Sequence, residues 1–225
     1  MLGLLFPRTC LLCNRWGSSL CSRCYGRFVP LVHDWCYYCG KRAKNGITHQ
    51  ECRRKRGFDG VQSWYYYNSA VKKLISQIKY ANRFAYYEEV LYQTSRVGLA
   101  KNSWYQDEKN LVLQPIPLHR HKERTRGFNQ AEVLAEYLSG CTGRPMVQAV
   151  HRVRNTAPQA HTSSRVHRHY NTLHAFSVYE PQLVSGKDVV VVDDVLTSGN
   201  TAKEVVSVLK SAGANNVYLF TYACL

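Results

Sequence analysis

Hydrophobic and polar positions recur along this chain with two different periods, and they predict strands and helices in turn. Four consecutive valines, Val189–Val192, are typical of a strand that is buried on both faces of a parallel sheet. Apolar residues at helical spacing predict a helix over Ala70–Ala81, and the same spacing recurs over Ala202–Ala212. The other expected elements are strands at Val61–Tyr67, Leu111–Pro117 and Val217–Tyr222, and helices at Tyr87–Leu99 and from Gly127 to Leu138. Their alternation through residues 111–222 predicts an α/β fold in which helices flank a parallel sheet.

Two adjacent carboxylates, Asp193 and Asp194, end the valine strand, and a short polar loop leads from them into the next helix. Ligands of open α/β sheets bind outside the carboxyl ends of the strands. The loop Thr197–Thr201 offers hydroxyls and backbone N–H groups at a helix N-terminus, which favours a bound phosphate. A plainer interpretation stays open, in which the acids only cap the helix that follows a buried strand. A nucleotide-binding P-loop is excluded because the chain has no G-x-x-x-x-G-K-[ST] motif.

This stretch resembles the signature of the type I phosphoribosyltransferases: a hydrophobic run, two acids, a hydrophobic residue and a T-[TS]-G-x-T loop. The resemblance implies that the acids hold the ribose hydroxyls of 5-phosphoribosyl 1-diphosphate (PRPP) and that the loop holds its 5-phosphate. Any catalytic role is assigned to the acid pair, Asp193 and Asp194. The ligand-binding residues implied in this stretch are Asp193, Asp194, Val195, Leu196, Thr197, Ser198, Gly199, Asn200 and Thr201.

Positive charge is concentrated in two regions of the 225-residue chain, whose formal net charge is +15. Residues 1–60 carry eleven Lys and Arg against three Asp and Glu, and residues 115–180 carry nine against four. Such regions favour a polyanionic partner, nucleic acid or a membrane surface, although a basic surface can also serve solubility alone. No apolar run approaches the ~18 residues that a membrane span requires. Met1–Pro7 is apolar but short and lacks a basic n-region, so we expect no signal peptide.

Four pairs of residues with metal-ligand spacing lie within the first part of the chain, before an expected linker at Gly57–Gly60. Two thiolates separated by two residues suit tetrahedral zinc because a tight turn directs both sulfurs at one point. The simplest assignment is sequential, with two sites, although an interleaved arrangement or a single zinc remains open. Disulfides are disfavoured where no secretion signal is present. The expected ligands are Cys10, Cys13, Cys21 and Cys24 for one site and Cys36, Cys39, His49 and Cys52 for the other. We therefore expect a zinc-binding domain over residues 1–56 and a second domain over residues 57–225.

A second anion site is expected where the strand Leu111–Pro117 ends. A basic loop is expected after this strand, leading into a helix N-terminus, where backbone N–H groups favour an anion. Basic runs are more often solvated surface, but this one lies at the carboxyl end of a strand. We expect Arg124 and Arg126 to lie beside the diphosphate of PRPP.

Several motifs, taken in order, resemble the ComF family, which also includes GntX-like proteins and has paired cysteines in an N-terminal zinc finger. The matching segments are Pro115–Leu118, Arg124–Gln130, Asn155–Gln159, Arg168–Asn171 with Ala175-Phe176, and Val189–Thr201. The resemblance implies a phosphoribosyltransferase-like domain and a role in natural competence, in which single-stranded DNA enters the cytoplasm beside a helicase. GntX-like members are linked to the use of DNA as a nutrient. In phosphoribosyltransferases a hood closes over the diphosphate, and Arg152, Arg154, Arg165 and Arg168 are the candidates for it here.

These observations favour a cytoplasmic protein with structural Zn²⁺ and no transmembrane segment, and a peripheral position at the inner face of the membrane is the alternative. It is expected to bind PRPP, or a related ribose phosphate, together with Mg²⁺, and to handle single-stranded DNA during uptake with a helicase as partner. The alternative is an active Mg²⁺-dependent phosphoribosyltransferase, which transfers the pentosyl group to an acceptor that no motif identifies. A third hypothesis is an interaction module whose zinc part docks the helicase and whose ligand site is regulatory.

Overall fold

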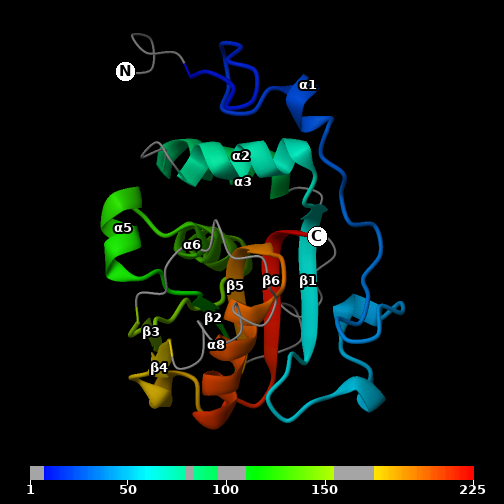
Figure 1. Cartoon of the computed structure of the whole chain (residues 1–225), viewed down its shortest axis with the longest axis vertical. Helices are drawn as coiled ribbons and strands as arrows, with labels where there is room; N and C mark the ends of the chain where they lie inside the picture. Colours follow the sequence, from blue (N-terminus) through cyan, green and yellow to red (C-terminus); the bar gives the residue numbers. More distant parts are fainter. Residues whose placement is uncertain (1–7, 80–83, 96–109, 155–174) are drawn as a thin grey trace.

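Four parallel strands form the central sheet of the computed structural model, which describes residues 8–79, 84–95, 110–154 and 175–225 (Figure 1). Neighbouring strands follow the order β1-β6-β5-β2, so the chain crosses the sheet between strands that are distant in sequence. The predicted parallel sheet with flanking helices is confirmed. The strands span Gly60–Tyr66 (β1), Leu111–Pro115 (β2), Asp188–Leu196 (β5) and Val217–Cys224 (β6).

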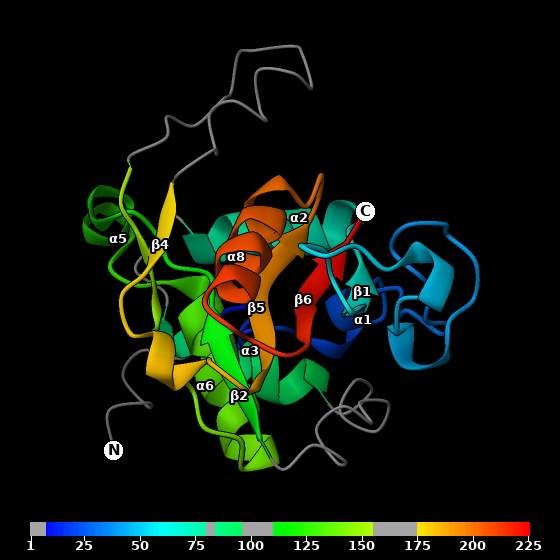
Figure 2. The same ribbon diagram turned by 90° about the horizontal axis from the view of Figure 1, so that it is seen from below.

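Both faces of the sheet are covered, which explains the valine run at its centre. Val189 and Val191 of β5 pack in one apolar cluster together with α8, Asn200–Ser211. Val190 and Val192 pack in the opposite cluster, because successive side chains of a strand point to opposite faces. Three helices pack in that cluster: α2 (Ser69–Lys79), α3 (Phe84–Thr94) and α6 (Gln130–Thr142). Of these, α2 lies across the carboxyl ends of the strands (Figures 1 and 2).

Two expectations about local structure are corrected in ways that matter for the site. The strand does not end at the acid pair, because β5 continues to Leu196 and its last residues pair with Ala223 and Cys224 of β6. The basic stretch is not a loop but a short helix, α5, over Arg120–Arg126. The expected ends of the helices at residues 80–81 and 96–99 lie outside the described residues.

The amino-terminal segment follows the edge of the sheet. It contains a short helix α1 (Ser22–Tyr25) and two 3₁₀ turns, η2 (Lys44–Gly46) and η3 (Gln50–Cys52). Between the cysteine clusters the chain bonds to the edge strand β1: Leu31 N–H donates to Trp64 O at 2.9 Å, and Tyr66 N–H donates to Val29 O at 2.9 Å. These bonds satisfy backbone groups that an open sheet edge would leave exposed.

A small two-stranded antiparallel sheet stands beside the carboxyl end of β2. It pairs β3 (Val150–Arg152) with β4 (Phe176–Val178), and a 3₁₀ turn, η6 (Pro181–Leu183), follows. The hood candidates Arg165 and Arg168 and the motif Asn155–Gln159 lie outside the described residues. Within the described ranges, no helix has both the length and the apolar character needed to cross a bilayer.

Candidate functional site

The acid pair lies near the carboxyl end of β5, as the sequence predicts, and it has a basic partner from another element. The backbone N–H of Asp194 donates to Asp193 Oδ1 at 2.8 Å. Lys79, the last residue of α2, places its Nζ 2.5 Å from Asp194 Oδ2. Both side chains of this ion pair are largely buried, with 24% of Lys79 and 14% of Asp194 exposed. One of the two carboxylates is therefore neutralised by the protein itself.

Burial and charge give the two acids different protonation behaviour. Burial, followed by the neighbouring Asp194 charge, raises the pKa of Asp193 to about 8, although the Asp194 N–H and Lys79 act in the opposite direction. Burial lowers the pKa of Lys79, but the two carboxylates together outweigh burial and hold the pKa above its usual value. At neutral pH the site thus contains an ion pair and, beside it, a protonated carboxyl that can donate a hydrogen bond.

A cavity of about 150 Å³ opens beside the acid pair. Gln130 at the start of α6 is 3% exposed, and its Oε1 accepts a hydrogen bond from Arg126 Nη1 at 3.3 Å. Its Nε2 is buried and has no hydrogen-bond partner among the described residues. A buried donor of this kind is costly unless a ligand or water oxygen completes it. The cavity is lined by Lys79, Ile116, Pro117, Leu118, Arg126, Asn129, Gln130, Ala131, Arg152, Asp193, Asp194 and Thr201.

The polar loop after β5 forms a second, smaller cavity of about 50 Å³ at the N-terminus of α8. Gly199 is the N-cap of this helix and has a φ of +70°, a conformation that glycine adopts without steric cost. Asp193 and Thr201 line both cavities, so the loop lies directly beside the acid pair. The residues around the smaller cavity are Asp193, Val195, Leu196, Thr197, Ser198, Gly199, Asn200, Thr201, Ala202, Leu219 and Thr221.

The structure brings only one of the two expected arginines to the cavity. Arg126, at the end of α5, is partly buried and lines it, whereas Arg124 is exposed and does not. Residues two positions apart point to different sides of a helix, and this separates the pair. Asn129 fixes the entry to α6, since its Oδ1 accepts from Ala131 N–H at 3.1 Å while its Nδ2 donates to Ile116 O at 3.0 Å.

A larger cleft of about 680 Å³ adjoins the acid-pair cavity and shares Pro117, Leu118, Asn129 and Arg152 with it. Its far wall comes from the small antiparallel sheet and from Tyr179, whose ring meets that of His151 edge to face at 4.9 Å. Glu132 lies in the same cleft and accepts a hydrogen bond from Gln148. This cleft has room for a second molecule beside one held at the acid pair.

The eight expected metal ligands gather into two sets, in the sequential arrangement: Cys10, Cys13, Cys21 and Cys24, and Cys36, Cys39, His49 and Cys52. In each set the ligand atoms lie within 4.8 Å of one another, close to the ~3.8 Å that tetrahedral zinc–thiolate bonds of about 2.3 Å impose. His49 Nε2 lies 3.0 Å from Arg42 O, so this nitrogen donates and leaves Nδ1 free to face Cys39 and a metal.

Local electrostatics favour one thiolate in each set, whereas burial and the neighbouring cysteines raise the pKa of Cys24 to about 12 and that of Cys52 to about 11. Burial raises the pKa of the Cys10 thiol, but the backbone N–H groups around it together outweigh burial and bring the value to about 6. The same balance brings the pKa of Cys36 to about 7. Thiolates bind zinc and thiols do not, so the backbone prepares one ligand of each set for the ion.

Two residues of the site escaped the sequence patterns. The helical periodicity puts Lys79 off the buried face of its helix, and only the position of α2 across the strand ends brings its ammonium group to Asp194. Gln130 falls within the Arg124–Gln130 motif, but nothing in that motif shows that its amide is buried and faces a cavity.

Comparisons with known proteins agree with this architecture. A phosphoribosyl transferase domain matches residues 124–223, and a double zinc ribbon domain matches residues 1–53. The DNA utilization protein YhgH of Salmonella typhimurium is 30% identical over 233 residues, which cover 96% of this chain and 97% of that protein. Competence protein F of Haemophilus influenzae is 27% identical over 212 residues, which cover 92% of this chain and 90% of that protein. Competence protein ComFC of Bacillus subtilis is 26% identical over 193 residues, which cover 82% of this chain and 75% of that protein. The chain therefore belongs to the ComF family of DNA utilization and competence proteins.

Proposed function

We propose that this protein binds PRPP, or a closely related ribose phosphate, at the acid pair, and that it handles single-stranded DNA during DNA uptake and use. The observation that carries the first part is that two cavities meet at the same residues, Asp193 and Thr201: one lies at a helix N-terminus, and the other is polar and lined by basic side chains. A ribose phosphate has the matching order of groups, with a phosphate at one end, hydroxyls in the middle and a diphosphate at the other end.

Each group of the ligand has a counterpart among the described residues. Asp194 accepts hydrogen bonds from ribose hydroxyls, and protonated Asp193 accepts or donates them. The loop Thr197–Thr201 offers backbone N–H groups to the 5-phosphate. The diphosphate lies nearest to the side chains of Arg126 and Gln130. Mg²⁺ bound to the diphosphate oxygens would neutralise their charge, and carboxylate oxygens such as those of the acid pair are its preferred protein ligands.

The test of this proposal is the affinity for PRPP with Mg²⁺, measured by isothermal titration calorimetry. The double variant Asp193→Asn/Asp194→Asn disturbs two interactions, worth roughly 1.5–3 kcal/mol at the charged Asp194 and roughly 0.5–1.5 kcal/mol at the protonated Asp193, so binding falls by about thirtyfold or more. Thr201→Val removes one hydroxyl at the junction of the cavities and weakens binding less. Equal affinity of wild type and double variant would show that the signature is only the end of a strand.

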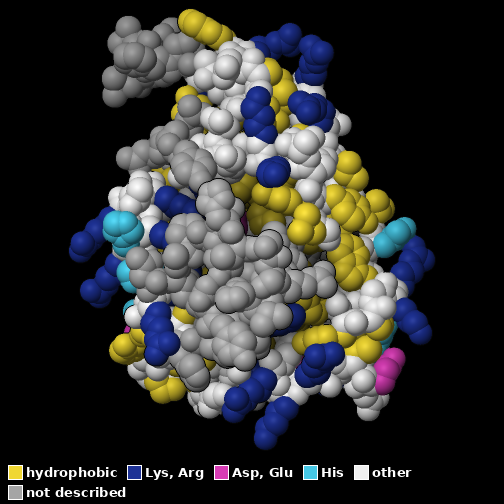
Figure 3. All heavy atoms as spheres, in the orientation of Figure 1, with side chains coloured by type: hydrophobic (Ala, Val, Ile, Leu, Met, Phe, Trp, Pro, Cys, Tyr) yellow, Lys and Arg dark blue, Asp and Glu magenta, His cyan; other side chains and the backbone are white. Residues whose placement is uncertain are grey.

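The second part of the proposal rests on family and charge. The relatives are named for DNA utilization and competence, and the chain has a net charge of +15. On the face shown in Figure 3, Lys and Arg side chains are spread over the surface, while Asp and Glu side chains are few. Nucleic acid phosphates are the polyanion that such a surface attracts. We place the protein in the cytoplasm or at the inner face of the membrane, beside a helicase that delivers the strand.

We also propose that the chain divides near residue 56 into a zinc-binding part and the ribose-phosphate part. The match of a double zinc ribbon to residues 1–53 supports this boundary. The backbone of β1 begins shortly after it, at Gly60.

Phosphoribosyl transfer is the second candidate, and the large cleft favours it. A ligand bound at the acid pair would have its C1 carbon near the boundary between the acid-pair cavity and the large cleft, which is formed by Pro117, Leu118, Asn129 and Arg152. The cleft then has room for an acceptor. Release of diphosphate from PRPP, measured in the presence of each common base and of single-stranded DNA, distinguishes this activity from binding alone.

A further inference from the structure

The second metal cluster touches the phosphate loop directly. Tyr37, which lies between the ligands Cys36 and Cys39, donates a hydrogen bond from its hydroxyl to Ser198 O at 3.3 Å. Residues 37 and 198 are 161 positions apart in the sequence, so no local pattern relates them. The same hydroxyl lies 2.7 Å from the point that a Cβ at Gly199 would occupy. Tyr37 therefore packs against the loop at its tightest turn.

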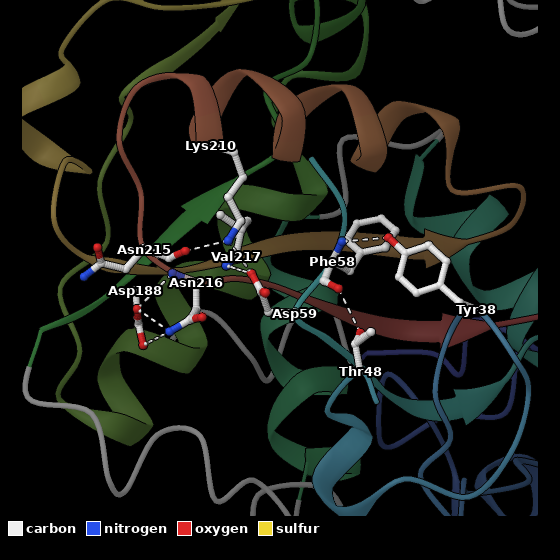
Figure 4. A network of polar contacts seen from close by, with 9 residues as sticks. All are labelled: Tyr38, Thr48, Phe58, Asp59, Asp188, Lys210, Asn215, Asn216 and Val217. Carbon is white, nitrogen blue, oxygen red and sulfur yellow. Dashed lines mark hydrogen bonds and ion pairs between the residues drawn. The ribbon is translucent and has the colours of Figure 1, made fainter. Parts of the chain in front are cut away.

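Tyr37 is itself held firmly from the other side. Its ring meets Phe58 edge to face at 4.9 Å and Tyr38 at 5.2 Å, and Phe58 is 1% exposed. Figure 4 shows the hydrogen bonds that join Phe58 to the zinc-binding segment. Phe58 N–H donates to the Tyr38 hydroxyl at 2.9 Å, and Thr48 Oγ1 donates to Phe58 O at 2.8 Å. Tyr37 is therefore packed into the same segment that carries the second set of metal ligands.

Charge supports the same contact. Lys203, in the first turn of α8, places its ammonium nitrogen 5.3 Å from the centre of the Tyr37 ring. A cation over an aromatic face is held by the negative potential of the ring. Tyr37 consequently contacts the start of α8 at two points, the carbonyl of Ser198 and the side chain of Lys203.

We propose that Tyr37 is a positioning residue of the phosphate loop, and that the metal in the Cys36, Cys39, His49 and Cys52 cluster controls phosphate binding by fixing Tyr37. The inference rests on the proposed function, because its ligand is the 5-phosphate of that same site. The residues of this cluster fit zinc, and a bound ion fixes the turn that carries Tyr37 between two of its ligands. Loss of the ion frees that turn, so the loop loses one wall and its N–H groups no longer converge on the phosphate.

Two matched pairs of variants test the inference. Tyr37→Ala removes the ring and the hydroxyl, whereas Tyr37→Phe keeps the ring. Cys39→Ser and Cys13→Ser each remove the exposed second cysteine of a C-x-x-C pair, one from each cluster. Metal content, measured by mass spectrometry of the purified proteins, verifies that each cysteine variant loses zinc from one cluster only.

The first measurement is binding of ribose 5-phosphate and, separately, of inorganic diphosphate with Mg²⁺. We expect Tyr37→Ala and Cys39→Ser to weaken ribose 5-phosphate binding by about tenfold and Tyr37→Phe by about threefold, as expected for the loss of one or two positioning contacts. Diphosphate binds at the other end of the site, so its affinity stays at the wild-type value in these variants and in Cys13→Ser. Equal losses for both ligands would indicate general unfolding and overturn the positioning role.

The second measurement is hydrogen exchange of the amides from Ser198 to Thr201, in protein without ligand. Exchange is faster in Tyr37→Ala and Cys39→Ser and unchanged in Cys13→Ser. This readout separates the two proposals: a wild type that binds neither ligand refutes the proposed function, while exchange still decides whether Tyr37 holds the loop. Unchanged exchange in Tyr37→Ala overturns the inference.

Discussion

At the scale of single residues, the site is defined by the different environments of two adjacent acids. Asp194 is paired with Lys79, while Asp193 is buried beside that pair and has its pKa raised to about 8. Burial, followed by the charge of Asp194, disfavours ionisation of Asp193 more than Lys79 favours it, so Asp193 tends to keep its proton. A protein that holds this proton before the ligand binds has a hydrogen-bond donor ready for a ribose oxygen.

The protonated Asp193 predicts a pH dependence of stability. The folded protein holds a proton between the unfolded pKa of about 3.8 and the folded pKa of about 8, and the unfolded chain does not. Stability falls with rising pH wherever the folded state binds more protons, so this group lowers the free energy of unfolding by up to about 1.4 kcal/mol per pH unit in that window. Asp193→Asn cannot titrate and removes this contribution.

Urea unfolding of wild type and Asp193→Asn at several pH values between about 4 and 8 measures it. Asp194→Asn serves as a comparison, since it leaves Lys79 to pair with Asp193 and therefore also flattens the slope. Parallel pH profiles for wild type and Asp193→Asn would show that Asp193 is ionised throughout this range.

The acid pair and the paired cysteines were predictable because their chemistry is local. Asp193 and Asp194 are neighbours in the chain, and each C-x-x-C pair lies within one turn. Lys79 and Tyr37 were not predictable, because each meets its partner only after α2 and the zinc-binding segment have packed against β5 and α8. Charge at a helix end and a tyrosine beside a cysteine are too common to indicate such roles.

At the scale of elements, the basic segment illustrates what helical geometry adds to composition. The sequence indicated a basic loop here, yet residues 120–126 form α5, and both of its ends are capped. His119 Nδ1 accepts from His121 N–H at 3.2 Å, and Gly127 ends the helix with a φ of +80°. The helix then sorts the two arginines, turning Arg126 towards the acid pair and Arg124 towards solvent.

This sorting predicts a large difference between two similar substitutions. Arg126→Ala removes a charged donor from the cavity and weakens PRPP binding by about tenfold to a hundredfold, given roughly 1.5–3 kcal/mol for a hydrogen bond to a charged group. Arg124→Ala removes the same charge from the same helix but from its exposed side, and changes the affinity by less than about threefold. Calorimetric titration of both variants decides it. A greater loss for Arg124→Ala would mean that α5 turns when the ligand binds.

The strand β5 shows why element boundaries were harder to predict than element types. Polar residues after the valine run suggested that the strand ended at the acids, but pairing with β6 extends it to Leu196. The partner strand, which lies later in the chain, supplies the hydrogen bonds. Pairing with β6 therefore decides where β5 ends, and the residues of β5 alone do not show that pairing.

At the scale of the whole molecule, the zinc-binding segment reaches both faces of the sheet. Leu11 and Leu20, from the first cluster region, pack with α2 and α3, and Arg8 forms an ion pair with Glu89 of α3 at 2.6 Å. Leu31 packs on the opposite face with α8, and Tyr37 and Tyr38 lie against that cluster. The apolar residues of this segment therefore complete the core of the rest of the chain, which its cysteine spacing alone does not indicate.

The contacts of the zinc-binding segment also refine the prediction about DNA. Arg53, Lys55 and Arg56 are exposed after the second cluster, whereas Arg54 lies over the Tyr38 ring at 4.6 Å and supports the fold. Replacement of the three exposed residues by Ala, with Arg54 kept, is therefore expected to leave the protein folded. Binding of single-stranded DNA falls with salt, with a log–log slope of about −0.7 for each phosphate contacted, so this triple variant gives a flatter slope if the segment contacts DNA.

Fluorescence anisotropy of a labelled oligonucleotide, titrated with salt, gives the slopes. A second triple variant, with Arg15, Arg23 and Arg27 replaced by Ala, changes the net charge equally and lies at the first cluster, where these side chains are also exposed. We expect the salt slope to fall more in the first variant than in the second. Of the two metal clusters, the second lies beside the loop Thr197–Thr201, so DNA bound there would lie near the ligand site. An equal loss of slope in both variants would show that total charge governs DNA binding. If folded, zinc-loaded wild type does not bind the oligonucleotide at low salt, direct DNA handling is refuted and phosphoribosyl transfer becomes the favoured function.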